Sequence, residues 1–61
     1  MNGKEIIKKL KAAGFLVLRT EGSHVRLGKG SIKVSVPLHG AHDVKPGTLG
    51  AIERQSGVKL K

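Results

Sequence analysis

The first apolar positions of the chain recur every three to four residues between residues 3 and 13, which is the period of an α-helix with one buried face. The apolar stripe consists of Ile6, Leu10 and Ala13, with Ile7 beside it. Asn2, followed three residues later by Glu5, has the pattern of an N-terminal capping box. Gly14 suits the left-handed conformation that ends many helices, and such an ending would let Phe15 fold back on the helix. The pattern therefore predicts a helix over residues 3–13.

The pattern then changes to short apolar segments, two of which strictly alternate apolar and polar residues, as β-strands with one buried face do. The segments are residues 15–20, 23–28 and 31–36. The pairs Glu21-Gly22 and Lys29-Gly30 between them predict two tight hairpin turns, and Pro37 is expected to end the third strand. These segments predict a three-stranded antiparallel meander.

The two predicted turns also predict which residues face each other across the strands. On one face the pairs are Leu18 with Val25, Val25 with Val34, and Leu27 with Ile32. On the other face the pairs are Arg19 with His24, His24 with Ser35, and Arg26 with Lys33. Because a slip of one residue in any strand would turn charges toward the core, this pattern favours one apolar face and one basic face. His24 is expected near the middle of the basic face.

A second helix is expected after a loop at residues 38–45. Pro46 suits the first turn of a helix, and Gly57 suits its end. The apolar stripe between them is weaker and consists of Leu49, Ile52 and Ser56. An α-β-β-β-α order with one apolar sheet face predicts a two-layer α+β domain with both helices on that face. The 61 residues leave no room for a second core, so we expect a single domain over residues 1–61.

The charge of the chain is strongly positive and points to a polyanionic partner. Twelve Lys and Arg against four Asp and Glu give a formal net charge of +8. Nucleic acid or an acidic protein would match this charge, whereas solubility alone needs less imbalance. The chain has no cysteine, which excludes thiolate chemistry and fits a reducing cytoplasm. No apolar run approaches the ~20 residues that span a bilayer, and the first residues do not resemble a signal peptide.

The chemistry available on the basic face is proton transfer next to cations. A histidine can take or give a proton near neutral pH, and RNA supplies its own nucleophile, the 2′-hydroxyl. His24 could act as base or acid in RNA cleavage, while Arg19, Arg26 and Lys33 stabilise the negative charge on phosphorus. Such a reaction requires no metal ion and no cofactor.

Other interpretations of the same residues remain open from the pattern alone. His24 could be an ordinary solvated residue, and the cations could protect the sheet from edge-to-edge association. The pattern favours phosphate binding by this face over catalysis, and the single aromatic residue gives little support for base stacking. His39, His42 and Asp43 could form a metal site, but a polar loop is the better interpretation.

Several motifs, in this order of elements, resemble the HicA family of bacterial toxins over nearly the whole chain. They are Gly14-Phe15, Arg19, Gly22-Ser23-His24 on the second strand, the segment VPLHG, and the segment KPGTLGAI. The resemblance implies a small mRNA interferase with a fold like that of double-stranded-RNA-binding domains. It also implies a cognate HicB antitoxin that neutralises the toxin.

The resemblance implies roles for single residues, since His24 matches the family's catalytic histidine. The residues expected to contact RNA are Arg19, Ser23, Arg26, Lys33, Ser35 and His39. Three positions depart from the family pattern: Val25 stands where many members have a second histidine, Leu27 stands where they have an aromatic residue, and Gly50 stands where a basic residue is frequent. The leading hypothesis is a metal-independent endoribonuclease toxin of the cytoplasm. The alternatives are a non-catalytic RNA-binding module and an interaction domain for an acidic protein, and the sequence does not determine the oligomeric state.

Overall fold

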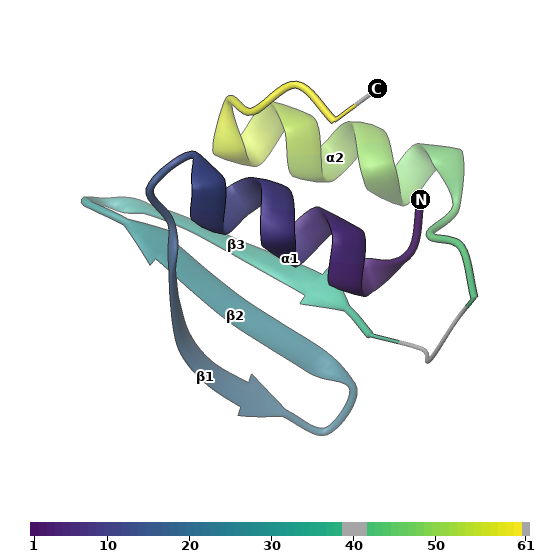
Figure 1. Cartoon of the computed structure of the whole chain (residues 1–61), viewed down its shortest axis with the longest axis horizontal. Coiled ribbons are helices and arrows are strands. Elements are labelled where there is room, and N and C mark those ends of the chain that lie inside the picture. The colour runs from purple at the N-terminus through teal and green to yellow at the C-terminus, as the bar shows by residue number, and fades with distance from the viewer. Residues whose placement is uncertain (39–41, 61) are drawn as a thin grey trace.

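The computed structural model describes residues 1–38 and 42–60 and has the predicted order of elements (Figure 1). The elements are α1 (Gly3–Ala12), β1 (Leu16–Glu21), β2 (His24–Lys29), β3 (Ile32–Pro37) and α2 (Pro46–Ser56). The strands form one antiparallel sheet in the order β1-β2-β3. Both helices lie on the same face of this sheet, which confirms the predicted two-layer α+β architecture.

Helix α1 begins and ends with the local interactions that the sequence predicts. The Asn2 side chain accepts a hydrogen bond from the Glu5 backbone N–H at 3.0 Å, and the Glu5 carboxylate accepts one from the Asn2 N–H at 3.0 Å. These two bonds form a capping box, which satisfies two N–H groups that the helix leaves unpaired. At the other end, Gly14 has a φ of 101°, and the Phe15 N–H donates to the Leu10 carbonyl at 3.0 Å.

Helix α2 also begins and ends where expected, at Pro46 and before the left-handed Gly57. The last helical residue, Ser56, is buried, and its hydroxyl donates to the Ile52 carbonyl at 2.7 Å. The same hydroxyl accepts a hydrogen bond from the Val58 N–H at 3.1 Å. The hydroxyl therefore both donates and accepts a hydrogen bond, which offsets most of the cost of burying it.

The hydrophobic core lies between the helices and strands β2 and β3. The buried apolar residues are Ile6, Leu10, Phe15, Val25, Leu27, Val34, Val36, Ile52 and Leu60. Strand β1 contributes none of its six residues to this core, since all six are exposed. Core packing against the helices thus holds β2 and β3 in addition to their backbone hydrogen bonds. Strand β1 is attached mainly through its backbone hydrogen bonds with β2.

The exposure of β1 shows that the predicted inward position of Leu18 is wrong. Leu18 is 54% exposed, and the register of β1 shifts between Val17 and Arg19, where one residue is inserted as a β-bulge. The bulge turns Leu18 toward Gly28: a Cβ atom built on Gly28 would lie 2.9 Å from Leu18 Cδ1. The absence of a side chain at Gly28 leaves the space that Leu18 occupies.

The predicted cross-strand pairs are also wrong, although each strand of the β2–β3 hairpin keeps its predicted face. The turns are Gly22-Ser23 and Gly30-Ser31, and the two glycines have φ values of 57° and 60°. Glycine at the first turn position, a preference of type II′ turns, moves each turn by one residue and each pairing by two. The observed pairs are His24 with Glu21 and Pro37, Arg26 with Arg19 and Ser35, Leu27 with Val34, and Gly28 with Lys33.

Candidate functional site

The three residues predicted to contact phosphate line one hollow, on the face of the sheet that the helices leave uncovered. Arg19, Arg26, Lys33 and Ser35 line this hollow, which has a volume of about 510 Å³. The other lining residues are Leu18, Leu27, Val34 and Gln55. We call this the cationic hollow. Its lining includes two guanidinium groups and one ammonium group, which are cations suited to contact an anion.

A carboxylate holds the two arginines of the cationic hollow in place. Arg19 and Arg26 are direct cross-strand neighbours, and like charges at such positions repel each other. Glu21 Oε1 lies 2.8 Å from Arg26 Nε and 3.4 Å from Arg19 Nε. All three side chains are exposed, so the ion pairs contribute little to stability. Their effect is to orient the guanidinium groups and to neutralise part of their charge.

His24 lies beside the cationic hollow, in a second hollow of about 810 Å³. It is the first residue of β2, and its side chain is exposed. The other residues that line this second hollow are Ser35, Pro37, His42, Asp43, Val44, Lys45 and Thr48. We call it the histidine hollow. Ser35 lines both hollows, so they meet at this residue.

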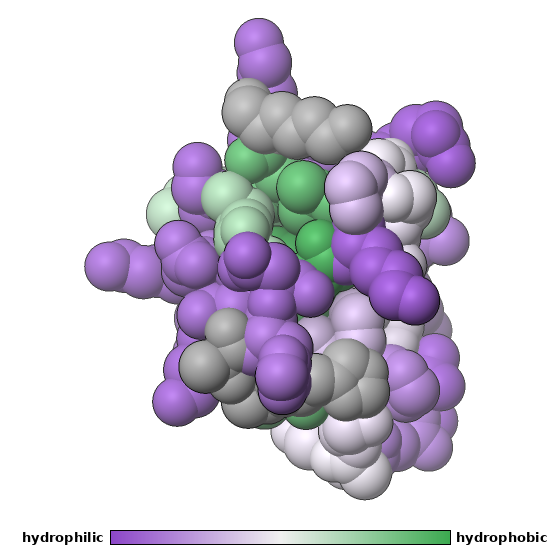
Figure 2. Space-filling model, turned by 90° about the vertical axis from the view of Figure 1, so that its right-hand side faces the viewer, coloured by the Kyte–Doolittle hydropathy of each residue, from purple (hydrophilic) through white to green (hydrophobic). Residues whose placement is uncertain are grey.

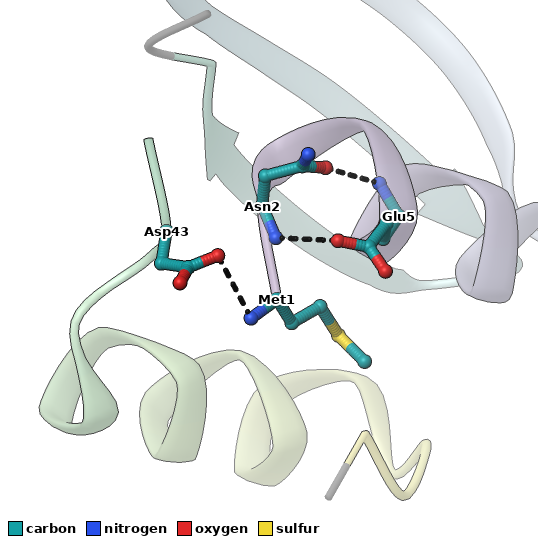
Figure 3. A network of polar contacts seen from close by, with 4 residues as sticks. All are labelled: Met1, Asn2, Glu5 and Asp43. Atoms are coloured by element: carbon teal, nitrogen blue, oxygen red, sulfur yellow. Dashed lines mark hydrogen bonds and ion pairs between the residues drawn. The ribbon is translucent and has the colours of Figure 1, made fainter. Parts of the chain in front are cut away.

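The chain's first two residues hold the loop segment that forms one wall of the histidine hollow (Figure 3). The Met1 amino group lies 3.1 Å from Asp43 Oδ1. The Val44 N–H donates to the Met1 carbonyl at 2.8 Å, and Asn2 and Asp43 form an isolated antiparallel bridge. Since Asn2 also caps α1, the segment that follows His42 is tied to the start of that helix.

Figure 2 looks onto the end of the molecule where β3 leads into α2. Apolar residues are visible in the upper middle of this view, with hydrophilic side chains below them and toward both sides.

Comparison with known families decides what kind of protein carries this site. Residues 3–58 match the family model described as the HicA toxin of bacterial toxin-antitoxin systems. The match spans most of the 61-residue chain. The chain belongs to the HicA toxin family. Membership implies a cognate antitoxin as a partner, and no curated protein matches the chain significantly.

Two further residues of this HicA toxin, Ser23 and His39, are predicted to contact RNA. Ser23 lies in the β1–β2 turn, where its carbonyl accepts a hydrogen bond from the Leu38 N–H at 2.6 Å. His39 lies outside the described residues. Ser23 is not among the residues that line the two hollows in the described part of the chain.

Two residues beside the predicted ones are not indicated as site candidates by the sequence. The pattern predicts a turn at Glu21, although its spacing of two from Arg19 places both on one face of a strand. It predicts a polar loop at His42, and no local pattern indicates that this residue lines the hollow of His24. That proximity depends on contacts between the first residues of the chain and residues 43–44.

The described residues of the HicA toxin, 1–38 and 42–60, were compared with the requirements of a metal site and of a membrane-spanning helix. Within these ranges no three His, Asp or Glu side chains lie close enough together to hold a metal ion. Neither helix in these ranges is long and apolar enough to cross a membrane.

Proposed function

We propose that this HicA toxin is an endoribonuclease that cleaves mRNA in the cytoplasm without a metal ion, using His24 as a general acid or base. One observation carries the proposal: the hollow lined by His24 adjoins the hollow lined by Arg19, Arg26 and Lys33. A proton-transfer group thus lies beside a binding site for anions.

The chemistry of RNA explains why these few groups are sufficient. The 2′-hydroxyl attacks the adjacent phosphorus once a base removes its proton, and an acid then protonates the departing 5′-oxygen. The phosphorus group gains negative charge in the transition state, and positioned cations stabilise that charge. RNA supplies the nucleophile and His24 a proton-transfer group, so the reaction requires neither a metal ion nor a cofactor.

Binding of the substrate is assigned to the cationic hollow and its surroundings. Arg19, Arg26 and Lys33 contact phosphate, and the Ser35 hydroxyl donates a hydrogen bond where the two hollows meet. Ser23 and His39 are further proposed contacts to RNA. The binding energy of this surface comes mainly from phosphate contacts, so it should fall steeply as salt concentration rises.

The cognate antitoxin, proposed to be of the HicB type, inhibits the toxin by covering the same groups. A partner that lays acidic or polar side chains over His24, Arg19 and Lys33 would block the phosphate site and neutralise part of the net charge of +8. Expression of the toxin should arrest growth, and co-expression of its antitoxin should restore it.

Incubation of purified protein with mRNA in EDTA tests the proposal. The wild type should cleave the RNA, whereas His24→Ala should bind it and leave it intact. Lys33→Gln should weaken RNA binding, while Lys8→Gln removes the same charge from an exposed position on α1 and serves as the matched control. Cleavage that requires added divalent metal, or full activity of His24→Ala, would contradict the proposed mechanism.

A non-catalytic RNA-binding module is the second candidate function. It is favoured by the fact that the cations and His24 line separate hollows, so anion binding does not depend on the histidine. Salt-sensitive RNA binding without cleavage by the wild type would establish this function instead.

A further inference from the structure

The proposed cleavage needs two proton-transfer groups, and His24 is only one of them. The base removes a proton from the 2′-oxygen, while the acid delivers one to the 5′-oxygen on the opposite side of phosphorus. The second group must therefore lie near His24 but across the bound phosphate from it. It must also exchange protons readily near neutral pH.

We infer that His42 is this second group, and this inference rests on the proposed function. His42 lines the histidine hollow together with His24, and both side chains are exposed to a substrate. His24 comes from the start of β2, whereas His42 comes from the segment that leads into α2. The two imidazoles thus reach the same hollow from different elements, so one could serve the attacking oxygen and the other the departing oxygen of a phosphodiester bound between them.

The other polar residues that line the histidine hollow are poorer proton-transfer groups. The Asp43 carboxylate is already engaged in an ion pair with the Met1 amino group at 3.1 Å. Lysine and hydroxyl side chains exchange protons near pH 10 or above in their ordinary state, so Lys45, Thr48 and Ser35 are less suited than an imidazole. Lys45 is better suited to add a cationic contact to the RNA than to carry a proton.

Glu21 is the nearest competitor outside the histidine hollow, because it lies opposite His24 across the β1–β2 ladder. Its carboxylate accepts a hydrogen bond from Arg26 Nε at 2.8 Å and lies 3.4 Å from Arg19 Nε. These two arginines of the cationic hollow hold the Glu21 carboxylate in place. We therefore assign Glu21 the role of positioning their guanidinium groups.

The backbone that directly follows His42 is tied to the start of the chain. The next two residues are fixed to the start of the chain by the Val44–Met1 hydrogen bond and by the bridge between Asn2 and Asp43. The Met1 amino group also pairs with the Asp43 carboxylate (Figure 3). Because Asn2 also caps α1, His42 is connected to the helical layer while His24 belongs to the sheet.

The proton balance of the reaction closes with these two residues alone. One imidazole, neutral at the start, takes the proton of the 2′-hydroxyl as the 2′-oxygen bonds to phosphorus. The bond from phosphorus to the 5′-oxygen breaks, and the other imidazole, protonated at the start, gives its proton to that oxygen. The products are a 2′,3′-cyclic phosphate and a 5′-hydroxyl, and proton exchange with water restores both histidines.

The test uses RNA substrates with either oxygen or sulfur at the 5′ leaving position. A thiolate departs without protonation because a thiol is a far stronger acid than an alcohol, so the sulfur substrate does not need the general acid. With the oxygen substrate, His24→Ala and His42→Ala should each lower the cleavage rate by about 100-fold or more. With the sulfur substrate, one of the two variants should recover nearly the wild-type rate and the other should not.

Three further measurements separate proton transfer from a structural role. His42→Gln, which keeps a polar side chain, should bind RNA as the wild type does and still cleave slowly. The wild-type rate should depend on pH as a bell-shaped curve, and each histidine variant should lose one limb of it. Lys8→Gln, on the outer surface of α1, should match the wild type throughout.

The outcomes distinguish this inference from the proposed function. If the wild type cleaves, His24→Ala is inactive and His42→Ala retains the full rate, then the inference about His42 is wrong while the proposed function stands. Equal defects of both variants on both substrates would also overturn it, because neither residue would then be the acid. If the wild type does not cleave RNA, the proposed function fails and the inference falls with it.

Discussion

Glu21 and Arg26 join the first two strands through a 2.8 Å hydrogen bond between the Glu21 carboxylate and Arg26 Nε. Arg19 approaches the same carboxylate oxygen to 3.4 Å, so one acidic group lies between two cations of the cationic hollow. A bound phosphodiester would have to share or displace this carboxylate. If the cationic hollow binds RNA as proposed, Glu21 competes with the RNA phosphate for these two arginines.

Glu21→Gln should therefore bind RNA more tightly. The substitution removes the competing charge but retains an oxygen that can accept a hydrogen bond. Since exposed ion pairs are worth roughly 0.2–1 kcal/mol, the affinity should rise about 1.4- to 5-fold at low salt. Affinity measured against salt concentration checks this, and the salt dependence should become steeper.

The matched control for this experiment is Glu5→Gln, which changes the net charge equally. Glutamine at this position can still complete the capping box, so α1 should be preserved. An equal gain in affinity for both variants would show that net charge, and not the Glu21 contact, controls RNA binding.

Leu18 and Leu27 should differ strongly in their contribution to stability, although both are leucines of the sheet. Leu18 is 54% exposed, whereas Leu27 is fully buried in the core. Leu27→Ala should lower the free energy of unfolding by about 2–5 kcal/mol, and Leu18→Ala by less than about 1 kcal/mol. Denaturant unfolding measures both, and a large loss for Leu18→Ala would contradict the bulge in β1.

Two glycines in helices should respond in opposite directions to substitution by alanine. A Cβ on Gly3 would lie 2.5 Å from the Pro37 carbonyl oxygen, so Gly3→Ala should be destabilising by roughly 1–3 kcal/mol despite its better helix propensity. At Gly50 the nearest atom would be Arg54 Nη1 at 3.9 Å, so Gly50→Ala should stabilise α2 by up to about 1 kcal/mol.

Thermal unfolding separates these two alanine variants. A change of about 1 kcal/mol shifts Tm by roughly 4–8 °C in a domain of this size. Gly3→Ala should therefore melt well below the wild type and Gly50→Ala above it. Shifts of the same sign would mean that the close approach of Gly3 to Pro37 does not control stability.

Asn2→Ala should cost about 1 kcal/mol, because the Glu5 N–H loses its side-chain acceptor. Asn2→Ser should retain most of the stability, since serine also caps helices. Circular dichroism during denaturation can follow both variants. Equal stability of the alanine and serine variants would show that the cap does not stabilise α1.

The parts of the fold that were predictable from the sequence depend on local interactions. The Asn2–Glu5 capping box, the left-handed Gly14 and Gly57, and the alternating strands each require only neighbouring residues. These signals were enough for the order of elements and for the two-layer architecture.

The sequence predicts the wrong cross-strand pairs because two positions for each hairpin turn fit the pattern almost equally well. Glycine can occupy either central position of a two-residue turn, and moving both turns by one residue preserves every face of the β2–β3 hairpin. The alternation therefore did not distinguish the observed pairing of Arg26 with Ser35 from the predicted pairing with Lys33. The bulge at Leu18 likewise does not change the pattern of apolar and polar residues in a way that would reveal it.

The candidate site was predictable only in part, for the same reason. The spacing placed Arg19, Arg26 and Lys33 on one face, because strand period alone determines it. The second hollow depends on contacts between residues 1–2 and residues 43–44, which are far apart in the chain. No local pattern could bring His42 to His24.

The exposure of β1 gives the two halves of the site different local stability. None of the six β1 residues is buried, so this strand should detach in local unfolding events that leave β2, β3 and the helices folded. Amide hydrogen exchange would then be fastest along β1. Each such opening would remove Arg19 and Glu21 from the cationic hollow and leave Arg26, Lys33 and His24 in place, so the proposed anion site would lose one of its three cations while the rest of it stays folded.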